Sequence, residues 1–394
     1  MLSNIYKPIS TGSTNQIAGL AKELKNRGHQ VHIITSMVEA NLPSREFHDE
    51  VWINRFKCIR LPRVKIAMNF AWLNWLTTPM NYRKVTQYLI ENKIDIIHVH
   101  NHMFDAMLLG FLVSKKTKVP VCLTLHTIMQ HNQKLYNFVL SIIDKLILKV
   151  LVSKWINVVI APDYNMVKYA EDKLGVGALE LIPYGVDEPL DVPSREITNF
   201  VKENSLFGRK VIISVGHVNH LRNRIDLVHA LAQVAKSDPA VLLVVIGDVA
   251  DKRALELVSK LSIDSHVLFT GIGTKEEITN WRRIALFEAQ WLDQAPDGSN
   301  SFGVASMEGM MAGNTVLSVA NIDTFGTDTL KNFSNIIVIQ PNSEVKLHDL
   351  ILELIQSPSM LETIGEQAKV FAQKNFSWSK NAEKHIDLYS RMKS

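Results

Sequence analysis

Two spacings of apolar residues alternate along the chain. Residues 14–27 carry apolar side chains three and four positions apart, which predicts a helix, and Gly28 after them ends it. Short, continuously apolar runs then alternate with further helical stretches. In the first half of the chain these runs are residues 31–35, 94–99, 119–126, 157–161 and 179–182. Strands that are apolar throughout and alternate with helices are typical of a parallel sheet covered on both faces.

The same alternation restarts after residue 208. Its predicted strands are residues 211–216, 241–247, 267–271, 286–291, 315–318 and 336–339. Between the two series, residues 188–208 contain two prolines and no strand pattern, so we interpret them as a linker. The chain is therefore predicted to fold as two doubly wound α/β domains. Ligands of such sheets bind outside the carboxyl ends of the strands.

Composition and charge exclude several classes of protein. The chain has 394 residues, of which 46% are hydrophobic and 21% charged, as in folded globular proteins. Its net charge of +4 is small and its basic residues are scattered, so we expect no nucleic-acid partner. Cys58 and Cys122 show no metal or redox spacing, which indicates a reducing cytoplasm. No apolar run has the length of a membrane span, and no signal peptide is expected.

At the amino terminus, residues 1–4 lead directly to Pro8 and to a turn at Gly12. A parallel α/β domain normally begins with a strand ahead of such a turn. We therefore expect either a very short first strand or a chain that starts late.

Residues 302–313 combine a turn, a short helix and one acidic side chain. Phe302 and Gly303 open the helix, and Glu308 lies inside it. The amides and the dipole at a helix N-terminus can receive phosphate oxygens, and Glu308 is close enough to accept hydrogen bonds from a sugar hydroxyl. The segment therefore suggests a nucleotide-sugar site. The alternative is an ordinary helix of an α/β sheet with an exposed glutamate.

Several fragments resemble one known family by their order and spacing. They are Tyr6-x-Pro8 with Gly12, Arg27-Gly28-His29-x-Val31, Asp95-Ile96-Ile97-His98-x-His100, Thr124-Leu125-His126, Ile182-Pro183-Tyr184-Gly185-Val186-Asp187, Ser214-Val215-Gly216, and Phe302-Gly303 through Glu308 to Gly313. Together they resemble the retaining nucleotide-sugar glycosyltransferases of family 4 over nearly the whole chain.

The resemblance implies the GT-B fold, an α/β architecture of two Rossmann-like, doubly wound domains that face a cleft. The acceptor-binding domain would be residues 1–187, followed by the linker 188–208 and a nucleotide-sugar-binding domain of residues 209–375. The last helix, in residues 376–394, would cross back to the first domain, with Ser377 as its N-cap.

The resemblance also assigns roles to single residues. His126 would lie beside the reacting sugar, Glu308 would bind the nucleotide ribose, and Arg222 would neutralise the leaving diphosphate, so these three are the expected catalytic residues. The expected donor-binding residues are Gly12, Ser13, Gly216, His217, Arg222, Asn300, Phe302, Gly303, Val304, Ala305 and Glu308. The donor would be a nucleotide-diphosphate-sugar, with no metal or other cofactor required.

Five positions depart from the usual pattern of this family. His217 replaces an arginine, Arg222 a lysine, Asn300 a glutamate, Ser13 a glycine and Tyr184 an asparagine. Arginine is a planar fork where lysine is a point charge, so even the replacement that keeps the charge changes the geometry. The departures at the donor site motivate an alternative function, a catalytically impaired glycosyltransferase-like subunit that binds a partner or a glycan.

His98, His100 and His102 alternate, and a continuing strand would place them on one face. A metal site is one interpretation. We favour the other, a strand that ends in a loop with histidines typical of the family, because no cysteine or carboxylate partner is suggested by the spacing.

Residues 63–84 and 133–154 combine apolar side chains with lysines or arginines, and the first stretch is also aromatic. Such stretches can rest on an anionic membrane surface, which would suit a lipid-linked acceptor. The alternative is core helices of the first domain with solvated lysines.

We therefore expect a retaining glycosyltransferase that moves a sugar from a nucleotide-diphosphate-sugar to a glycan or lipid-linked acceptor, in surface polysaccharide or glycoconjugate synthesis. Its location would be the cytoplasm, with peripheral attachment to the inner face of the membrane as a further possibility. A sugar-nucleotide epimerase or a phosphorylase of the same fold is a third hypothesis.

Overall fold

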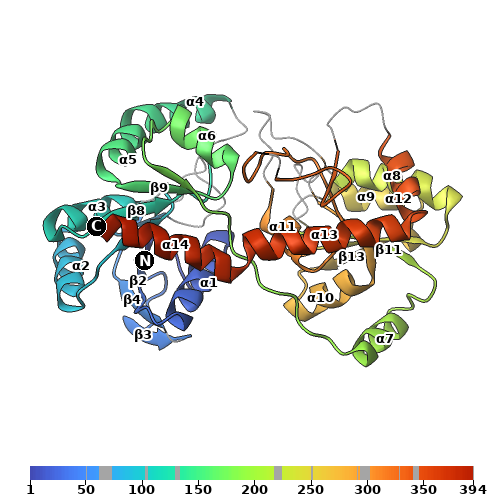
Figure 1. Ribbon diagram of the computed structural model, residues 1–394, viewed down its shortest axis with the longest axis horizontal. Helices are drawn as coiled ribbons and strands as arrows, with labels where there is room; N and C mark the ends of the chain where they lie inside the picture. The colour runs from blue at the N-terminus through green and yellow to red at the C-terminus, as the bar shows by residue number, and fades with distance from the viewer. Residues whose placement is uncertain are drawn as a thin grey trace. The chain divides into compact units, whose positions relative to one another are not determined.

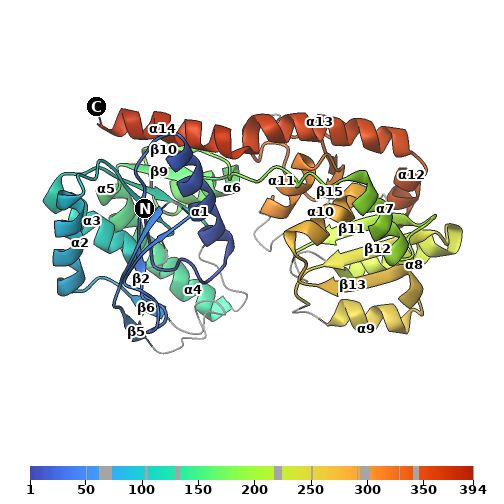
Figure 2. The ribbon, with the colours of Figure 1, turned by 90° about the horizontal axis from the view of Figure 1, so that it is seen from below.

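The computed structural model of the protein describes residues 1–49, 51–61, 73–102, 105–128, 134–216, 224–249, 252–290, 292, 302–327, 329–339 and 346–393. The chain divides into two compact units, and in each of them helices cover a mainly parallel sheet (Figures 1 and 2). Unit 1 comprises Met1–Gly185 and Trp378–Ser394, and unit 2 comprises Val186–Ser377.

Unit 1 is built on an eight-stranded sheet in the order β10-β9-β8-β7-β1-β2-β4-β3. The strands are β1 (Leu2–Ser3), β2 (His32–Ser36), β3 (Arg45–His48), β4 (Val51–Phe56), β7 (Ile97–His100), β8 (Val121–Thr124), β9 (Val158–Ala161) and β10 (Leu179–Leu181). All neighbours are parallel except β3 and β4. The five strands predicted for this half are confirmed, while the antiparallel edge and a separate pair, β5 (Ile59–Leu61) and β6 (Leu73–Trp75), were not predicted.

Helices of unit 1 bury their apolar faces against these strands. They are α1 (Gly12–Asn26), α2 (Pro79–Glu91), α3 (Ala106–Thr117), α4 (Lys134–Ile143), the π-helical turn η1 (Asp144–Leu148), α5 (Lys149–Trp155), α6 (Tyr164–Asp172) and α14 (Trp378–Lys393). In α1 the predicted apolar face is confirmed, since Ile17, Leu20, Ala21 and Leu24 are all buried. Val99, Val121 and Leu123 are fully buried in the sheet, as expected for strands covered on both faces.

The C-terminal helix α14 packs on unit 1, next to α1 (Figures 1 and 2). The Trp378 ring fills the space left by two glycines, because a Cβ on Gly19 or Gly185 would lie 2.0 or 2.2 Å from that ring. Farther along the helix, Asn381 Nδ2 donates to the carbonyl of Pro183 at 2.6 Å. The glycine of the Tyr184-Gly185 motif is therefore required for the packing of this last helix.

Unit 2 has a six-stranded parallel sheet in the order β13-β12-β11-β14-β15-β16. The strands are β11 (Lys210–Val215), β12 (Val241–Ile246), β13 (Val267–Gly271), β14 (Ala285–Ala289), β15 (Val316–Ser318) and β16 (Ile337–Val338), and all six were predicted. The helices are α7 (Ser194–Glu203), α8 (Arg224–Ser237), α9 (Arg253–Lys260), the 3-10 turn η3 (Asp264–His266), α10 (Lys275–Ile284), α11 (Val304–Met311), α12 (Leu347–Ile355) and α13 (Pro358–Phe376). The segment interpreted as a linker, 188–208, contains α7, which packs on α10.

Candidate functional site

Helix α11 and the turn before it form the segment predicted as the nucleotide-sugar site. Gly303 is the N-cap, in an extended conformation, and its carbonyl accepts a hydrogen bond from the amide of Ser306 at 2.9 Å. Phe302 is buried and meets Phe325 edge-on, with ring centroids 5.5 Å apart, which anchors the turn. The helix therefore begins at Val304, and the first amides of a helix have no partner within it and can receive an anion.

The carboxylate of Glu308 is held by an arginine that the sequence analysis did not identify. Arg282, on α10, donates Nη1 to Glu308 Oε2 at 3.4 Å and Nε to Glu288 Oε2 at 2.9 Å. Its Nη2 also donates to the carbonyl of Ala305 at 3.1 Å. Glu288, on β14, is fully buried and accepts a further hydrogen bond from Gln290. Arg282 therefore ties β14 to two turns of α11.

Gly309 leaves the space that the Glu288 carboxylate occupies. A Cβ at Gly309 would lie 2.6 Å from Glu288 Oε2, which is too close for any side chain. The close approach of α11 to β14 therefore depends on glycine at this position of the predicted motif.

Glu308 differs from Glu288 in its access to solvent. The Glu308 side chain is 40% exposed, whereas that of Glu288 is fully buried. Burial raises the pKa of Glu308, the negative charges of Glu288 and Asp187 raise it further, and Arg282 opposes them. One carboxylate is thus used for structure, and the other keeps oxygen lone pairs that a ligand hydroxyl can reach.

Two further glycines among the expected donor-binding residues can be placed in the structure. The backbone at Gly12 faces open space, and Gly216 has a backbone conformation that favours glycine. In unit 1, Gly12 is the first residue of α1, after Thr11, whose side chain accepts a hydrogen bond from the amide of Thr14. A Cβ at Gly12 would meet nothing within 4 Å. The next residue, Ser13, lies beside Thr11, with the two hydroxyl oxygens 3.1 Å apart. In unit 2, Gly216 follows β11 with a φ of 119°, a conformation that side chains disfavour.

His126 lies just beyond β8 and has both ring nitrogens hydrogen-bonded within unit 1. Its Nδ1 is 2.9 Å from the Tyr184 hydroxyl, and its Nε2 is 3.1 Å from Nδ1 of His100. Burial lowers the pKa of His126 to about 3, and the charge of His102 adds to this effect. The imidazole is therefore neutral at physiological pH.

The alternating histidines hydrogen-bond β7 to its surroundings. His98 is 2.6 Å from the Tyr389 hydroxyl of α14 and 2.7 Å from Thr124 Oγ1 of β8. His102 Nε2 is 2.9 Å from the Tyr169 hydroxyl of α6. Within the residues that the structure describes, no group of three histidine, cysteine, aspartate or glutamate side chains is arranged to hold a metal ion.

Three predicted site residues, His217, Arg222 and Asn300, lie outside the described residues. The structure instead shows a buried arginine at the start of α8, Arg224, which is 1% exposed and donates Nη1 to the carbonyl of Gln290 at 3.1 Å. The sequence analysis missed this residue because a basic residue at the start of a helix usually faces solvent.

One signal for the missed ionic group was present in the sequence. Glu288 is the one charged residue in a run, residues 286–291, that was predicted as a strand. A charged residue in a buried strand requires an opposite charge nearby. The sequence did not indicate that the partner is Arg282.

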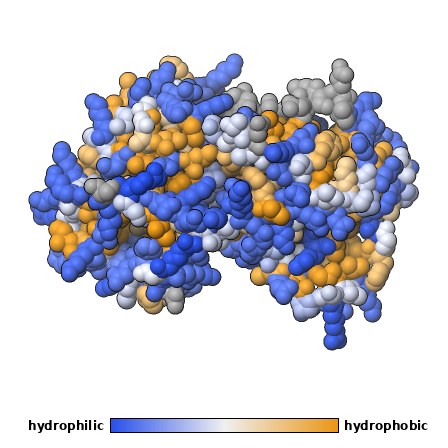
Figure 3. Space-filling view, viewed as in Figure 1, coloured by the Kyte–Doolittle hydropathy of each residue, from blue (hydrophilic) through white to orange (hydrophobic). Residues whose placement is uncertain are grey.

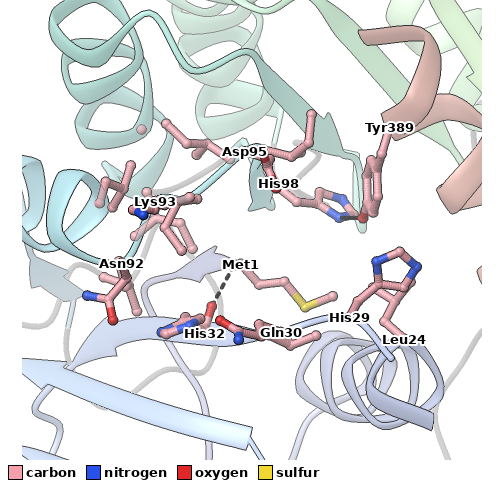
Figure 4. A pocket seen from close by; sticks show the side chains of 18 of the residues that line it. Met1, Leu24, His29, Gln30, His32, Asn92, Lys93, Asp95, His98 and Tyr389 are labelled. Atoms are coloured by element: carbon pink, nitrogen blue, oxygen red, sulfur yellow. Dashed lines mark hydrogen bonds between the residues drawn. The ribbon is translucent and has the colours of Figure 1, made fainter. Parts of the chain in front are cut away.

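A cavity of about 440 Å³ in unit 1 lies at the amino ends of the strands, opposite to the carboxyl ends where His126 and His100 lie (Figure 4). Its lining includes His32, the first residue of β2, and Ile97, the first residue of β7. Met1 also lines it and donates its amino group to the carbonyl of His32 at 2.7 Å. His126 and His100 lie at the carboxyl ends of the strands, where ligands of such sheets bind, so this cavity is not part of the predicted site.

Comparison with known proteins gives a consistent result for both halves of the chain. Residues 10–189 match the model of Glycosyltransferase Family 4, and residues 196–371 match that of Glycosyl transferases group 1. The chain is 24% identical over 388 residues to the alpha-monoglucosyldiacylglycerol synthase of Streptococcus pneumoniae, covering 95% of this chain and 82% of that protein. It is 22% identical to the N-acetyl-alpha-D-glucosaminyl L-malate synthase of Bacillus anthracis, covering 94% and 91%.

A solved structure shows the same fold. HepE of Anabaena, crystallised in complex with UDP, is 16% identical in sequence and superposes with a TM-score of 0.72 over 99% of this chain and 98% of that one.

Proposed function

The chain belongs to glycosyltransferase family 4 and has the GT-B fold, and from this premise we propose that it moves a sugar from a nucleotide-diphosphate-sugar to a glycan or lipid-linked acceptor. The observation that carries the proposal is the arrangement at α11. Helix α11 begins at Val304, and the half-exposed carboxylate of Glu308 lies one turn farther on, hydrogen-bonded to Arg282. Diphosphate oxygens would meet the amides, and a ribose hydroxyl would donate to Glu308.

The proposed reaction retains the configuration of the sugar. The bond from the anomeric carbon to the leaving phosphate oxygen breaks, and a bond to the acceptor oxygen forms on the same face. The acceptor proton passes to the leaving phosphate oxygen, so no pair of catalytic carboxylates is needed. Charge develops on the diphosphate, and the amides at the start of α11 would stabilise it there. We therefore propose that no metal is required, and that chelation with EDTA leaves the rate unchanged.

The proposed acceptor side includes a membrane surface. The exposed face of α4, η1 and α5, here called the α4–α5 stripe, repeats apolar residues at helical spacing with lysines beside them, and Figure 3 shows hydrophobic side chains in this part of unit 1. Its apolar residues are Leu135, Phe138, Val139, Ile142, Leu146 and Val150, and its lysines are Lys134, Lys145, Lys149 and Lys154. Three of the apolar side chains are 65–70% exposed, whereas the apolar side chains of core helices with solvated lysines would be buried.

Apolar side chains flanked by lysines fit the interface of an anionic bilayer. Among the described helices none has the length and apolar character to cross a membrane. We therefore propose peripheral attachment at the cytoplasmic face, which would bring a lipid-linked acceptor to unit 1. One of the curated relatives is named for synthesis of a glucosyl diacylglycerol, which supports this acceptor class.

The donor is tested first. Purified protein is incubated with UDP-, GDP-, ADP- and dTDP-sugars, and nucleotide release and saturable binding are measured. We expect one donor to bind and to release its nucleotide, and both signals to be lost in Glu308→Ala. A folded protein that binds none of the donors would contradict the proposal and favour the non-catalytic subunit, for which His217 and Asn300 are the sequence evidence.

The membrane is tested separately with vesicles. Binding to phosphatidylglycerol-containing vesicles, measured by sedimentation, should decrease by at least about tenfold in Phe138→Glu, since a charge in the apolar stripe costs a few kcal/mol on insertion and each 1.4 kcal/mol is a factor of about ten. Phe207→Glu is the matched control, because Phe207 is 69% exposed in unit 2 and Phe138 is 65% exposed. Equal binding of both variants and the wild type would contradict the proposed membrane contact.

A further inference from the structure

Tyr184 departs from the family pattern and contacts the residue expected beside the reacting sugar. It follows β10 in the Ile182-Pro183-Tyr184-Gly185 motif, and the family usually has asparagine at its position. Its ring stacks on His126 with centroids 5.6 Å apart and an interplanar angle of 10°. The ring of His100 has its centroid 5.4 Å from that of His126, at an interplanar angle of 24°. His126 therefore contacts two rings.

Both nitrogens of His126 are hydrogen-bonded to these two neighbours. Nδ1 is 2.9 Å from Tyr184 Oη, and Nε2 is 3.1 Å from His100 Nδ1. The Tyr184 hydroxyl oxygen also lies 3.4 Å from the carbonyl oxygen of Leu125, to which it can donate. Nε2 of His100 is buried, and it has no hydrogen-bond partner in the described part of the chain. The group is thus a short chain of hydrogen bonds that ends at His100.

The number of protons allows two arrangements of this chain. If Tyr184 donates to His126 Nδ1, then His126 Nε2–H donates to His100, and a buried N–H is left unpaired on His100. If Tyr184 instead donates to Leu125, then His126 Nδ1–H donates to Tyr184 and His100 Nδ1–H donates to His126. The second arrangement makes one more hydrogen bond and leaves only a bare ring nitrogen on His100, so we expect it to dominate.

We propose that Tyr184 is a positioning residue, which together with His100 holds His126 as a neutral imidazole with its proton on Nδ1 and with one ring orientation. The functional part of this inference rests on the proposed glycosyl transfer, in which His126 lies beside the donor sugar. A fixed, uncharged ring there would shape the site without placing a positive charge beside an anomeric carbon that itself becomes positive.

The surroundings of His126 favour the neutral state from several sides. Among the described residues, the titratable groups around it include His98 and His100 of β7, His102 after β7 and Tyr184, and Asp163 at the start of α6 acts on Tyr184. Burial lowers the pKa of His100 well below its ordinary value and that of His102 to about 4, so both rings are neutral as well. Loss of the Tyr184 hydroxyl would free the ring of His126 to turn toward solvent and to titrate.

The test compares Tyr184→Phe with Tyr88→Phe. The Tyr88 hydroxyl is 2.7 Å from Nδ1 of His32, so the control removes the same kind of bond in the same unit, at the amino end of β2. With ¹⁵N-labelled histidine, NMR should show the Nδ1–H form of His126 in the wild type and in Tyr88→Phe. In Tyr184→Phe we expect a mixture of tautomers and a pKa of His126 closer to the ordinary value of about 6.5.

Activity is the second readout. With the donor found in the panel, we expect kcat of Tyr184→Phe to fall about tenfold with little change in the donor KM, and Tyr88→Phe to keep the wild-type kcat. An unchanged tautomer and pKa of His126 in Tyr184→Phe would overturn the inference, as would an equal loss of kcat in both variants. The NMR arm needs no turnover, so a wild type without activity refutes the proposed function and leaves the NMR result decisive for the positioning of His126.

Discussion

Each unit contains a cluster of polar side chains at its predicted site. The cluster of unit 1 is held by hydrogen bonds between neutral groups, and that of unit 2 by ion pairs. In unit 1 the cluster consists of imidazoles and a phenol, Tyr184, His126 and His100, which are linked by single hydrogen bonds. In unit 2 it consists of Arg282 between two carboxylates, those of Glu288 and Glu308. The first cluster carries no charge at neutral pH, and the second holds charged groups in contact.

The difference follows from the chemistry of the side chains. Histidine can lose its proton when burial disfavours the charged form, and the lowered pKa values of His126 and His100 show that response. Arginine cannot lose its proton in a protein, so a buried Arg282 requires carboxylates. The neutral cluster suits contact with an uncharged sugar, whereas a charged cluster beside helical amides suits ribose and diphosphate.

The largest expected effect is the loss of the charge that pairs with Glu288. Arg282→Met would leave the fully buried Glu288 carboxylate without its ionic partner. Removing one member of a buried pair costs about 3–5 kcal/mol of unfolding free energy. Urea unfolding of both proteins would measure this cost directly.

Lys210→Met is the matched control for Arg282→Met. Lys210 pairs with Asp238 at 2.7 Å, but its side chain is 40% exposed, so we expect a loss of only about 0–1 kcal/mol. A similarly small loss for Arg282→Met would show that the ionic cluster of unit 2 contributes little to the free energy of unfolding. The charged cluster would then be no more important for stability than an exposed ion pair.

How much of this site could be predicted depended on the distance along the chain between interacting residues. Glu308 and the turn at Gly303 belong to one segment, and local spacing predicted them. Arg282 lies 26 positions before Glu308, on a different helix, and they meet because β14 lies between β11 and β15 in the sheet. Alternation of apolar runs predicts strands but not their order, so such pairs could not be predicted.

The same limit applies in unit 1. The sequence marked Tyr184 as a departure and placed His126 near the sugar, yet their contact spans 58 positions. The predicted helices and strands were largely correct because apolar periodicity is local. The strand β3 is mostly exposed and carries little of that signal, and the apolar residues of the buried strand β4 are interrupted by Asn54 and Arg55. Helix α7 does have apolar residues at helical spacing, and it was not predicted because the two prolines in this part of the chain led us to interpret residues 188–208 as a linker.

A smaller effect is expected from the protonation of Glu308. Its raised pKa means that the carboxylate takes up a proton at a higher pH than an ordinary glutamate, as the pH falls. Because the proposed role of Glu308 is to accept hydrogen bonds, donor affinity should decrease on the acid side of that pKa. A hydrogen bond to a charged group contributes about 1.5–3 kcal/mol, so Glu308→Gln should weaken donor binding by about 10- to 150-fold at pH 7.5.

Glu308→Gln should also remove the acid-side decrease, because an amide does not titrate in this range. The donor KM is measured from pH 5 to 8 in the wild type, in Glu308→Gln and in Glu362→Gln, whose side chain is exposed on α13. The control should follow the wild type. If Glu308→Gln kept the full pH dependence of the wild type, another group would have to be responsible for it.

The smallest effect tests whether unit 1 approaches the donor through backbone. A Cβ at Gly12 meets nothing within 4 Å, so Gly12→Ala causes no clash within the protein, and alanine in place of glycine favours a helix. The folded protein should be as stable as the wild type or slightly more so. If donor phosphate lies against this backbone, the added methyl group should still weaken donor binding, by about 1 kcal/mol or about fivefold.

Gly177→Ala is the control for Gly12→Ala, because Gly177 also has open space at its Cβ and lies in unit 1. Thermal unfolding and donor KM are measured for both variants. Weaker donor binding only in Gly12→Ala, without loss of stability, would mean that the methyl group meets the ligand, since it meets nothing in the protein. An unchanged KM would instead mean that the donor does not lie against the backbone at Gly12, and the proposed contact of unit 1 with the donor would then have to be made by other residues, such as His126.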